Sequence, residues 1–401
     1  MRSVSEFASY FASGPRSPLI IRSVAEMHLA RTGMDLSITS SRSSRRLARV
    51  GFVPTMGALH AGHLGLVAAA RVGGGIDASP PDFTVASVFV NPAQFAPHED
   101  LGAYPRTWDS DSNALEVAKA SVIFAPTASS MYPPTAPFRS FVNPAGADDA
   151  TPEGSARVGF FRGVATVVTK LFAAVRPTEA WFGQKDGVQC IIVRSLTRDL
   201  NFPIHVRIAP TAREHDGLAM SSRNVYLSQT QRKGAGIIYA ALKEAVEIVD
   251  KSPEGIEAKE LAAAAVASIA SSSSTLLQVD NAAAERAAQA ASFARSSSSS
   301  SSSSSDGGGN AKLPISADTL LTRVAAHVRE RILSEPSFTS VEYVAFSDAL
   351  TGAPIGRLRD STARGGAVML SLVARAGSTR LLDNVILVGN HTDLGAAPGE
   401  K

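Results

Sequence analysis

Residues 50–71 constrain the fold of this 401-residue chain more than any other stretch. The apolar run 50–53 predicts a short buried strand, which Pro54 ends. Gly57 permits a tight turn close to a ligand, and a helix is expected to begin near His60. The first N–H groups of a helix lack partners within it, and the helix dipole is positive there, so this position favours an anion. The stretch therefore predicts a strand–turn–helix unit with a phosphate site at its turn.

His60 and His63 lie three residues apart, so both should project from one face of the first helical turn. Two imidazoles directed at a phosphate can donate hydrogen bonds and offset charge on a pentacoordinate phosphorus. Such a pair can also be structural, exposed, or part of a metal site. The strand–turn–helix setting favours phosphate, and no nearby cysteine or obvious carboxylate completes a set of metal ligands.

Apolar strand-like runs alternate with helical patterns up to about residue 210. This alternation predicts a parallel sheet with right-handed crossovers, in which ligands bind at the carboxyl ends of the strands. We therefore expect an α/β fold with a Rossmann-like nucleotide-binding domain over residues 18–210. Strands are expected at 50–53, 83–90, 121–125, 179–182 and 205–209, with helices near 110–119, 163–175 and 188–200.

The pattern changes after residue 211, where we expect a smaller α+β domain over residues 211–393. Ser228 and Gln231 form a capping box that should start a helix reaching about residue 249. The serine-rich segment 271–314 lacks the apolar content to fold, which predicts a disordered insertion. A further helix is expected at 316–333, and strands at 341–346, 367–374 and 381–388.

Composition argues against several classes of protein. The net charge is only +3 and the basic residues form no long patch, so we expect no nucleic-acid partner. Without a run of 18 apolar residues we expect no membrane span. The single cysteine, Cys190, fits a reducing compartment, and we expect a cytoplasmic protein. Residues 1–17 are expected to form a disordered tail, with an organellar transit peptide as an alternative, and 394–401 a second tail.

Three further polar clusters suit small-molecule binding. The amides of Asn91 and Gln94, just past a strand, can bind a hydroxyl and a carboxylate, although an Asn-Pro turn without a ligand is the alternative. Lys185 follows a strand at a glycine turn, as phosphate-binding lysines do, or it forms a solvated pair with Asp186. Two hydroxyls and a guanidinium in one loop suit a triphosphate, namely Ser221, Ser222 and Arg223.

Together these clusters resemble the pantothenate synthetases (pantoate–β-alanine ligases) over about residues 18–270 and 315–393. The motifs are, in order, Pro-Thr-Met-Gly-Ala-Leu-His-x-Gly-His, Phe-Val-Asn-Pro-x-Gln-Phe, Tyr-Pro-Arg-Thr and Ser-Ser-Arg-Asn. The resemblance implies a nucleotidyltransferase-type Rossmann domain with a HIGH-like signature at His60–His63. It also implies ATP-dependent condensation of (R)-pantoate with β-alanine through a pantoyl-adenylate, releasing AMP and pyrophosphate, in a homodimer that uses Mg²⁺.

The resemblance also implies residue roles. His63, His60, Lys185 and Arg223 would be catalytic, with His63 at the position of the family's proton donor. Gln94, Gln189, Asn91 and Tyr104 would bind pantoate or β-alanine, and Asp111 would bind Mg²⁺. ATP would contact Met56, Gly57, Ala58, Leu59, His60, Ala61, Gly62, His63, Gly183, Gln184, Lys185, Asp186, Ala212, Met220, Ser221, Ser222 and Arg223.

The chain departs from the family pattern at three places. Gln184 replaces a glutamate, Val188 replaces the first of two glutamines, and Ser110 replaces an aspartate that the family often has. The last change leaves Asp111 and the ATP phosphates to hold Mg²⁺. Two other functions stay open: a nucleotidylyltransferase acting on a phosphorylated acceptor, and a non-catalytic nucleotide or RNA binder.

Overall fold

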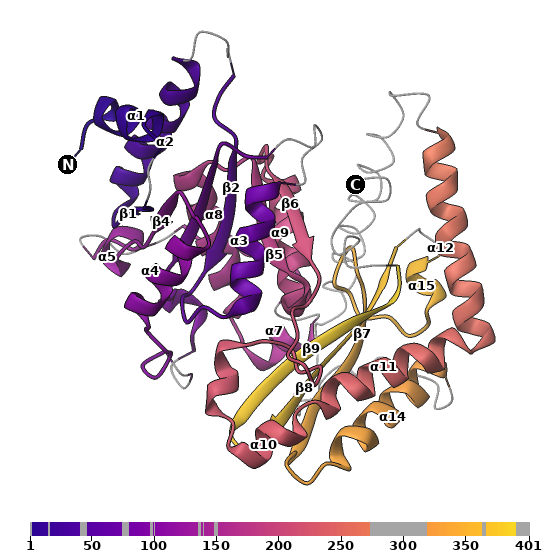
Figure 1. Ribbon diagram of the computed structural model, residues 1–401. Helices are drawn as coiled ribbons and strands as arrows, with labels where there is room; N and C mark the ends of the chain where they lie inside the picture. Colours follow the sequence, from indigo (N-terminus) through magenta and orange to yellow (C-terminus); the bar gives the residue numbers. More distant parts are fainter. Residues whose placement is uncertain are drawn as a thin grey trace, which may run out of the picture.

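Two sheets organise the molecule, one parallel and one antiparallel (Figure 1). The computed structural model describes residues 2–14, 17–40, 46–73, 80–96, 99, 101–134, 138, 140–147, 151–272, 319–362 and 366–389. Residues 265–272 are described by their backbone. The predicted tail at 394–401 and the predicted insertion, apart from its first two residues, lie outside these ranges.

The first sheet has the strand order β1-β4-β3-β2-β5-β6, and every pair in it is parallel. It confirms the expected Rossmann-like α/β class, and the strands predicted near 50, 83, 121, 179 and 205 are all present. The strands are β1 (Leu19–Ile21), β2 (Val50–Thr55), β3 (Phe83–Val88), β4 (Val122–Phe124), β5 (Glu179–Gly183) and β6 (His205–Ala209).

Helices cover both faces of this sheet. Side chains alternate along a strand, so Val50 and Phe52 of β2 pack into one core with α2, α8 and α9, while Val53 packs with α3 and α4. At Gly51 a Cβ would lie 2.7 Å from the Ala70 carbonyl oxygen, so only glycine lets α3 approach this closely. The helices are α2 (Val24–Thr39), α3 (Ala61–Val72), α4 (Trp108–Val117), α8 (Phe160–Val175) and α9 (Gly187–Asp199).

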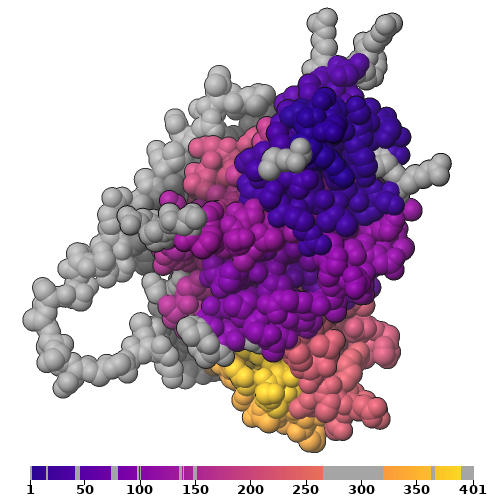
Figure 2. All heavy atoms as spheres, turned by 90° about the vertical axis from the view of Figure 1, so that its left-hand side faces the viewer, coloured from indigo at the N-terminus to yellow at the C-terminus, as the bar shows by residue number. Residues whose placement is uncertain are grey.

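The second sheet is an antiparallel meander of β7 (Ser340–Asp348), β8 (Val368–Ala376) and β9 (Thr379–Val388). Helices α11 and α14 pack on it and complete a separate core, as expected for a smaller α+β domain. Figure 2 shows the orange and yellow residues of this part below the indigo and magenta residues of the first. The helices here are α10 (Gln229–Gly234), α11 (Ile237–Asp250), α12 (Pro253–Ser272), α14 (Leu320–Leu333) and α15 (Arg359–Thr362).

The helix expected to reach about residue 249 is in fact two helices. The capping box of Ser228 and Gln231 is present and begins α10, but α10 ends at Gly234 and α11 begins at Ile237. Glycine is a poor helix former, and a Cβ at Gly236 would lie 2.8 Å from the Asp216 carbonyl oxygen. The helix therefore breaks where the chain passes close to the loop that precedes Ser221 and Ser222.

The prediction of a disordered tail over residues 1–17 is wrong for helix α1 (Val4–Ala12). Ser3 and Glu6 form a capping box, and the side chains of Phe7 and Phe11, four residues apart, are buried against the rest of the domain. The ring centroid of Phe11 lies 5.0 Å from that of Phe83 in β3. Two buried phenylalanines and a cap thus attach the N-terminus to the first core.

Short elements connect the larger ones, and several of them lie at the site described next. Among the described residues no helix is both long and apolar enough to cross a bilayer. The short elements are η1 (Pro92–Gln94), α5 (Ala128–Met131), α7 (Pro152–Ala156), η2 (Gln184–Asp186) and η3 (Ser222–Tyr226).

Candidate active site

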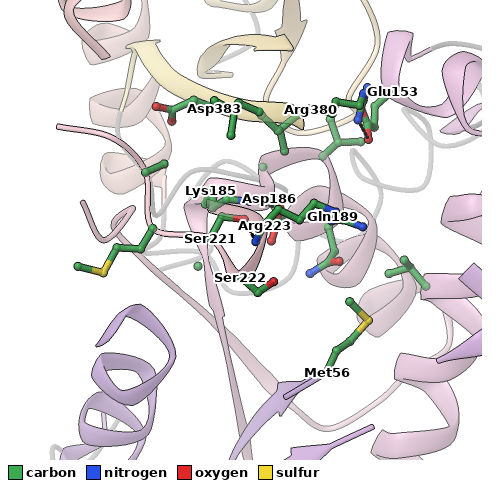
Figure 3. A pocket seen from close by; sticks show the side chains of 18 of the residues that line it. Met56, Glu153, Lys185, Asp186, Gln189, Ser221, Ser222, Arg223, Arg380 and Asp383 are labelled. Carbon is green, nitrogen blue, oxygen red and sulfur yellow. Dashed lines mark hydrogen bonds and ion pairs between the residues drawn. The ribbon is translucent and has the colours of Figure 1, made fainter. Parts of the chain in front are cut away.

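A cavity of about 910 Å³ is lined by the carboxyl edge of the parallel sheet, by the loop after β6 and by β8 and β9. Figure 3 shows Arg380 and Asp383 of β9 on one side, Met56 on the other, and Lys185, Ser221 and Arg223 between them. The predicted residues that line it are Met56, His60, Gly62, His63, Asn91, Gln94, Tyr104, Gly183, Lys185, Asp186, Gln189, Ala212, Met220, Ser221, Ser222 and Arg223. Residues predicted from clusters far apart in the sequence therefore meet at one place.

The turn between β2 and α3 has an unusual backbone. Gly57 and Ala58 both have positive φ, +86° and +49°, so two successive residues take the left-handed conformation. The Thr55 hydroxyl accepts a hydrogen bond from the Gly57 N–H at 3.2 Å and donates to the Ser87 carbonyl oxygen at 2.5 Å. The turn is thereby tied to the neighbouring strand β3.

Asp111, in α4, binds the backbone of the same turn. Its buried carboxylate accepts hydrogen bonds from the N–H groups of Ala58, at 2.9 Å, and Leu59, at 2.8 Å. The Thr107 hydroxyl donates to it at 3.1 Å. The predictions that Asp111 binds Mg²⁺ and that these two N–H groups cradle phosphate do not fit this geometry, because the groups satisfy one another and Asp111 does not line the cavity.

The two histidines stand side by side at the start of α3, with ring centroids 4.0 Å apart. The His60 backbone N–H donates to His63 Nδ1 at 3.4 Å, which leaves the proton of a neutral His63 ring on Nε2. Burial lowers the pKa of His60 to about 4, assisted by the Lys185 charge, and that of His63 to about 3, assisted by His60. Both imidazoles are therefore neutral near pH 7 and act as hydrogen-bond donors rather than charges.

Lys185 lies in η2, on the turn between β5 and α9, and faces the cavity. Its ammonium is 3.3 Å from the Asp186 carboxylate, whose side chain is 48% exposed. A pair with Asp186 was the alternative to phosphate binding that the sequence allowed for Lys185. Since a single ion pair with an exposed carboxylate contributes little energy, it leaves the ammonium available to an anionic ligand.

The Ser-Ser-Arg segment also lines the cavity. Ser221 caps η3, and its hydroxyl accepts from the Arg223 backbone N–H at 3.3 Å. The Ser222 hydroxyl lies 3.2 Å from the hydroxyl of Tyr104, and the Tyr226 hydroxyl donates to the Ala103 carbonyl oxygen at 3.2 Å. The loop thus closes against the 103–104 segment of the first domain, and Tyr104 contacts the loop as well as the cavity.

Asn91 supports Gln94 instead of offering a free amide. Its Nδ2 donates to Gln94 Oε1 at 3.0 Å and to the Gly163 carbonyl oxygen at 3.2 Å, while its Oδ1 accepts from Ala93 N–H and the Tyr132 hydroxyl. These four bonds fill its capacity, so direct substrate binding by Asn91 does not fit its contacts. Among the described residues, Gln94 Nε2 has one hydrogen-bond partner, Met56 Sδ at 3.3 Å. Its second hydrogen can therefore be donated to a ligand.

An ionic network at the far end of the cavity was not found from the sequence. The Arg157 guanidinium pairs with Glu99 at 2.5 and 3.0 Å. Arg380 of β9 pairs with both oxygens of Glu153, at 2.8 and 2.6 Å, and with Glu342 at 2.8 Å. Positions so distant along the chain give no local pattern, although Arg380 lies in a Thr-Arg-Leu-Leu-Asp-Asn segment that resembles the family.

Residues 28–386 match the family model described as pantoate-beta-alanine ligase. The pantothenate synthetase of Chloroflexus aggregans is 47% identical over 228 residues, which cover 57% of this chain and 74% of that protein. The one from Herpetosiphon aurantiacus is 50% identical over 210 residues, covering 52% and 72%.

Solved structures agree in fold. The pantothenate synthetase of Thermus thermophilus has 32% sequence identity and a TM-score of 0.63, and the match covers 92% of this chain and 100% of that one. The pantoate-beta-alanine ligase of Francisella tularensis, solved in complex with beta-gamma ATP and beta-alanine, has 22% identity and a TM-score of 0.57 over 92% and 98% of the two chains. The sequence match, the shared architecture and the cavity together place this chain in the pantoate–β-alanine ligase family.

Proposed function

We propose that this chain catalyses the ATP-dependent condensation of (R)-pantoate with β-alanine to pantothenate, through a pantoyl-adenylate. The observation that carries the proposal is the meeting, in one cavity, of two neutral imidazoles, a lysine and a serine–arginine loop beside two glutamine amides. The Francisella ligase, solved with beta-gamma ATP and beta-alanine, supports ATP and β-alanine as ligands here.

The first step activates the pantoate carboxylate. A carboxylate oxygen attacks the α-phosphorus of ATP, the bond from that phosphorus to the bridging oxygen breaks, and pyrophosphate leaves. Negative charge builds on the phosphoryl oxygens in the transition state. His60, His63 and Lys185 are proposed to donate hydrogen bonds to it, and preformed donors of this kind stabilise a transition state without reorganising.

The second step forms the amide. The amine of β-alanine attacks the acyl carbon, AMP leaves with one former carboxylate oxygen, and the amine loses a proton. Gln94 and Gln189 are proposed to orient pantoate, which contributes through proximity. Ser221, Ser222 and Arg223 are proposed to close over the phosphates as a lid. The two steps require no nucleophilic side chain.

A protein-held Mg²⁺ does not fit the described residues. Asp111 is occupied by backbone N–H groups. The described part of the chain contains no group of three or more His, Cys, Asp or Glu side chains that could hold a metal ion. We therefore propose that Mg²⁺ enters with the ATP phosphates, which are its usual ligands in such enzymes.

The alternative of a nucleotidylyltransferase needs a cation for a phosphorylated acceptor. Arg157 is the cation beside Gln94, and it is already paired with Glu99. A neutral amide and a compensated guanidinium suit a hydroxy acid better than a phosphate. This charge balance favours pantoate over a phosphorylated acceptor.

We also propose a cytoplasmic homodimer that binds only small-molecule substrates and no nucleic acid, from the resemblance, the modest net charge and the single cysteine. The resemblance implies a dimer, and the charge pattern lacks a basic patch. Light scattering on the purified protein checks the mass, which for one chain is 41.8 kDa.

The oxygen atoms give the sharpest test of the proposed reaction. Pantoate labelled with ¹⁸O in its carboxylate is incubated with ATP and β-alanine, and the products are analysed by mass spectrometry. We expect one AMP for each pantothenate, with one ¹⁸O atom in the AMP phosphate. Unlabelled AMP would contradict carboxylate attack on phosphorus. Turnover only with a phosphorylated acceptor would favour the nucleotidylyltransferase. The absence of any turnover would favour a non-catalytic binder.

A further inference from the structure

The Lys185 turn is held by a side chain from the other domain. Asn384, in β9, is 1% exposed. Its Nδ2 donates hydrogen bonds to the carbonyl oxygens of Gln184, at 2.9 Å, and Lys185, at 2.8 Å. Its Oδ1 accepts from Gln184 Nε2 at 3.1 Å. One buried amide thus binds two consecutive main-chain carbonyls and also accepts a hydrogen bond from the Gln184 side chain.

These contacts decide where Lys185 stands. The lysine side chain itself has one partner among the described residues, the exposed Asp186 carboxylate, and so is weakly held. Its Cα position and the direction of its stem are instead set by the backbone that Asn384 binds. The close packing continues at Gly187, where a Cβ would clash with Met369 Sδ of β8 and would lie 3.3 Å from Asn384 Nδ2.

The residue next to Asn384 is connected to the loop that leads to Ser221. Asp383 forms a two-pronged pair with Arg213, at 2.6 and 3.0 Å, and the Asp383 side chain is 2% exposed. Arg213 also donates to the Gly217 carbonyl oxygen at 3.0 Å, in the loop that leads to Ser221. Two adjacent residues of β9 therefore contact both the lysine turn and, through Arg213, the loop that leads to Ser221.

We propose that Asn384 is a positioning residue for the reaction: it places the Lys185 ammonium on the ATP phosphates, so that the C-terminal domain acts on the nucleotide through the lysine turn. This inference rests on the proposed function. It assigns Asn384 no contact with substrate, because both of its polar atoms are used within the protein.

Four purified full-length proteins test it: wild type, Asn384→Ala, Lys185→Met and the double variant. Kinetic constants for ATP and for pantoate are measured for each. Asn384→Ala should raise KM for ATP about tenfold, the order expected for losing a few buried hydrogen bonds, and leave KM for pantoate within about twofold. In the Lys185→Met background the same substitution should change KM for ATP by less than about twofold, because residues that act through one another are not additive.

Two further variants separate positioning from folding. Asn384→Asp keeps the shape but turns the donor toward the carbonyls into an acceptor, so it should impair ATP use at least as much as alanine. Leu387→Ala removes a core side chain from the same strand, 2% exposed and away from the lysine turn. It should lower the melting temperature and leave KM for ATP unchanged. If Asn384→Ala fails to fold, Asn384→Ser, which keeps one donor, takes its place in the cycle.

The outcomes distinguish the inference from the function on which it rests. Wild-type protein that forms no pantothenate would contradict the proposed function. If the wild type is active, two results for Asn384→Ala would overturn the positioning role and leave the function standing. One is an equal loss of ATP and pantoate affinity, and the other is a loss that persists fully in the Lys185→Met background.

Discussion

Two turns of the parallel sheet face the cavity, and they are held by opposite chemistry. In the histidine turn, the Asp111 carboxylate accepts from two consecutive N–H groups. In the lysine turn, the Asn384 amide donates to two consecutive carbonyls. Asp111 belongs to the same domain as its turn, whereas Asn384 comes from the other domain. The histidine turn is therefore complete within the first domain, and the lysine turn depends on the contact between the two.

The largest effect should come from the histidine turn. His63→Ala removes one transition-state donor and should lower turnover by about a hundredfold or more. The variant should stay folded, because within the described part of the chain the ring's one hydrogen bond is a long contact of 3.4 Å with His60 N–H. Turnover and thermal melting are measured together. Near-normal turnover, or an unfolded variant, would refute a catalytic role.

The second prediction concerns the support beneath that turn. Asp111→Ala removes the partner of the partly buried N–H groups of Ala58 and Leu59, which should cost about 1 kcal/mol of unfolding free energy for each group. Turnover should fall as well, because the turn carries both histidines. Asp109→Ala, an exposed carboxylate of the same helix, is the matched control and should change neither. Urea unfolding and turnover are the measurements.

Asp111→Ala also sharpens the comparison between the turns. The two supports share no partner, so the stability losses of Asp111→Ala and Asn384→Ala should add within about 0.5 kcal/mol in the double variant. A large interaction free energy would mean that the turns are not independently held.

The third prediction concerns substrate choice at the two glutamines. Gln94→Ala and Gln189→Ala should raise KM for pantoate by about tenfold and leave KM for ATP within about twofold, since each removes an amide that we propose binds the hydroxy acid. Steady-state kinetics with each substrate varied in turn gives both values. Equal loss for both substrates would indicate a structural role.

The smallest effect is expected from pH. The pKa values of His60, about 4, and His63, about 3, lie below the ordinary value of 6.5. As the pH falls below 6.5, the unfolded chain binds protons that the folded protein excludes. Stability from these groups is therefore full above pH 6.5 and declines as the pH falls, down to about pH 4 for His60 and about pH 3 for His63.

Urea unfolding at pH 7 and pH 5 checks this sign. The loss of stability between the two values should be smaller in His63→Gln than in wild type. Imidazole NMR resonances of His60 and His63 should not titrate near pH 6.5 in the folded protein. A titration there would contradict the buried, neutral state.

The sequence predicted the histidine turn well because its signal is local. A strand, a proline, a glycine and a His-x-x-His pair lie within 14 residues, and the alternating pattern around them fixed the parallel sheet. The contacts of Asp111 could not be read from the sequence in the same way. Its two N–H donors lie 53 and 52 residues earlier, and only the folded sheet brings them to its carboxylate.

The lysine turn shows what a local pattern does not contain. Asn384 lies 200 residues after Gln184, in a different domain, and its role depends on how the two sheets meet. The ionic network of Arg380 and Glu153, 227 residues apart, is of the same kind. The N-terminal helix is a different case: its capping box and paired phenylalanines are local features of the sequence, although residues 1–17 were expected to form a tail.

Exchange of labelled pyrophosphate into ATP tests the central claim most directly. If a pantoyl-adenylate forms in the cavity before the amine is needed, purified protein should exchange label when pantoate is present and β-alanine is absent. Exchange should vanish without pantoate and fall sharply in Lys185→Ala, which lacks the ammonium that we propose contacts the phosphates. Absence of pantoate-dependent exchange in the wild-type protein would contradict the account.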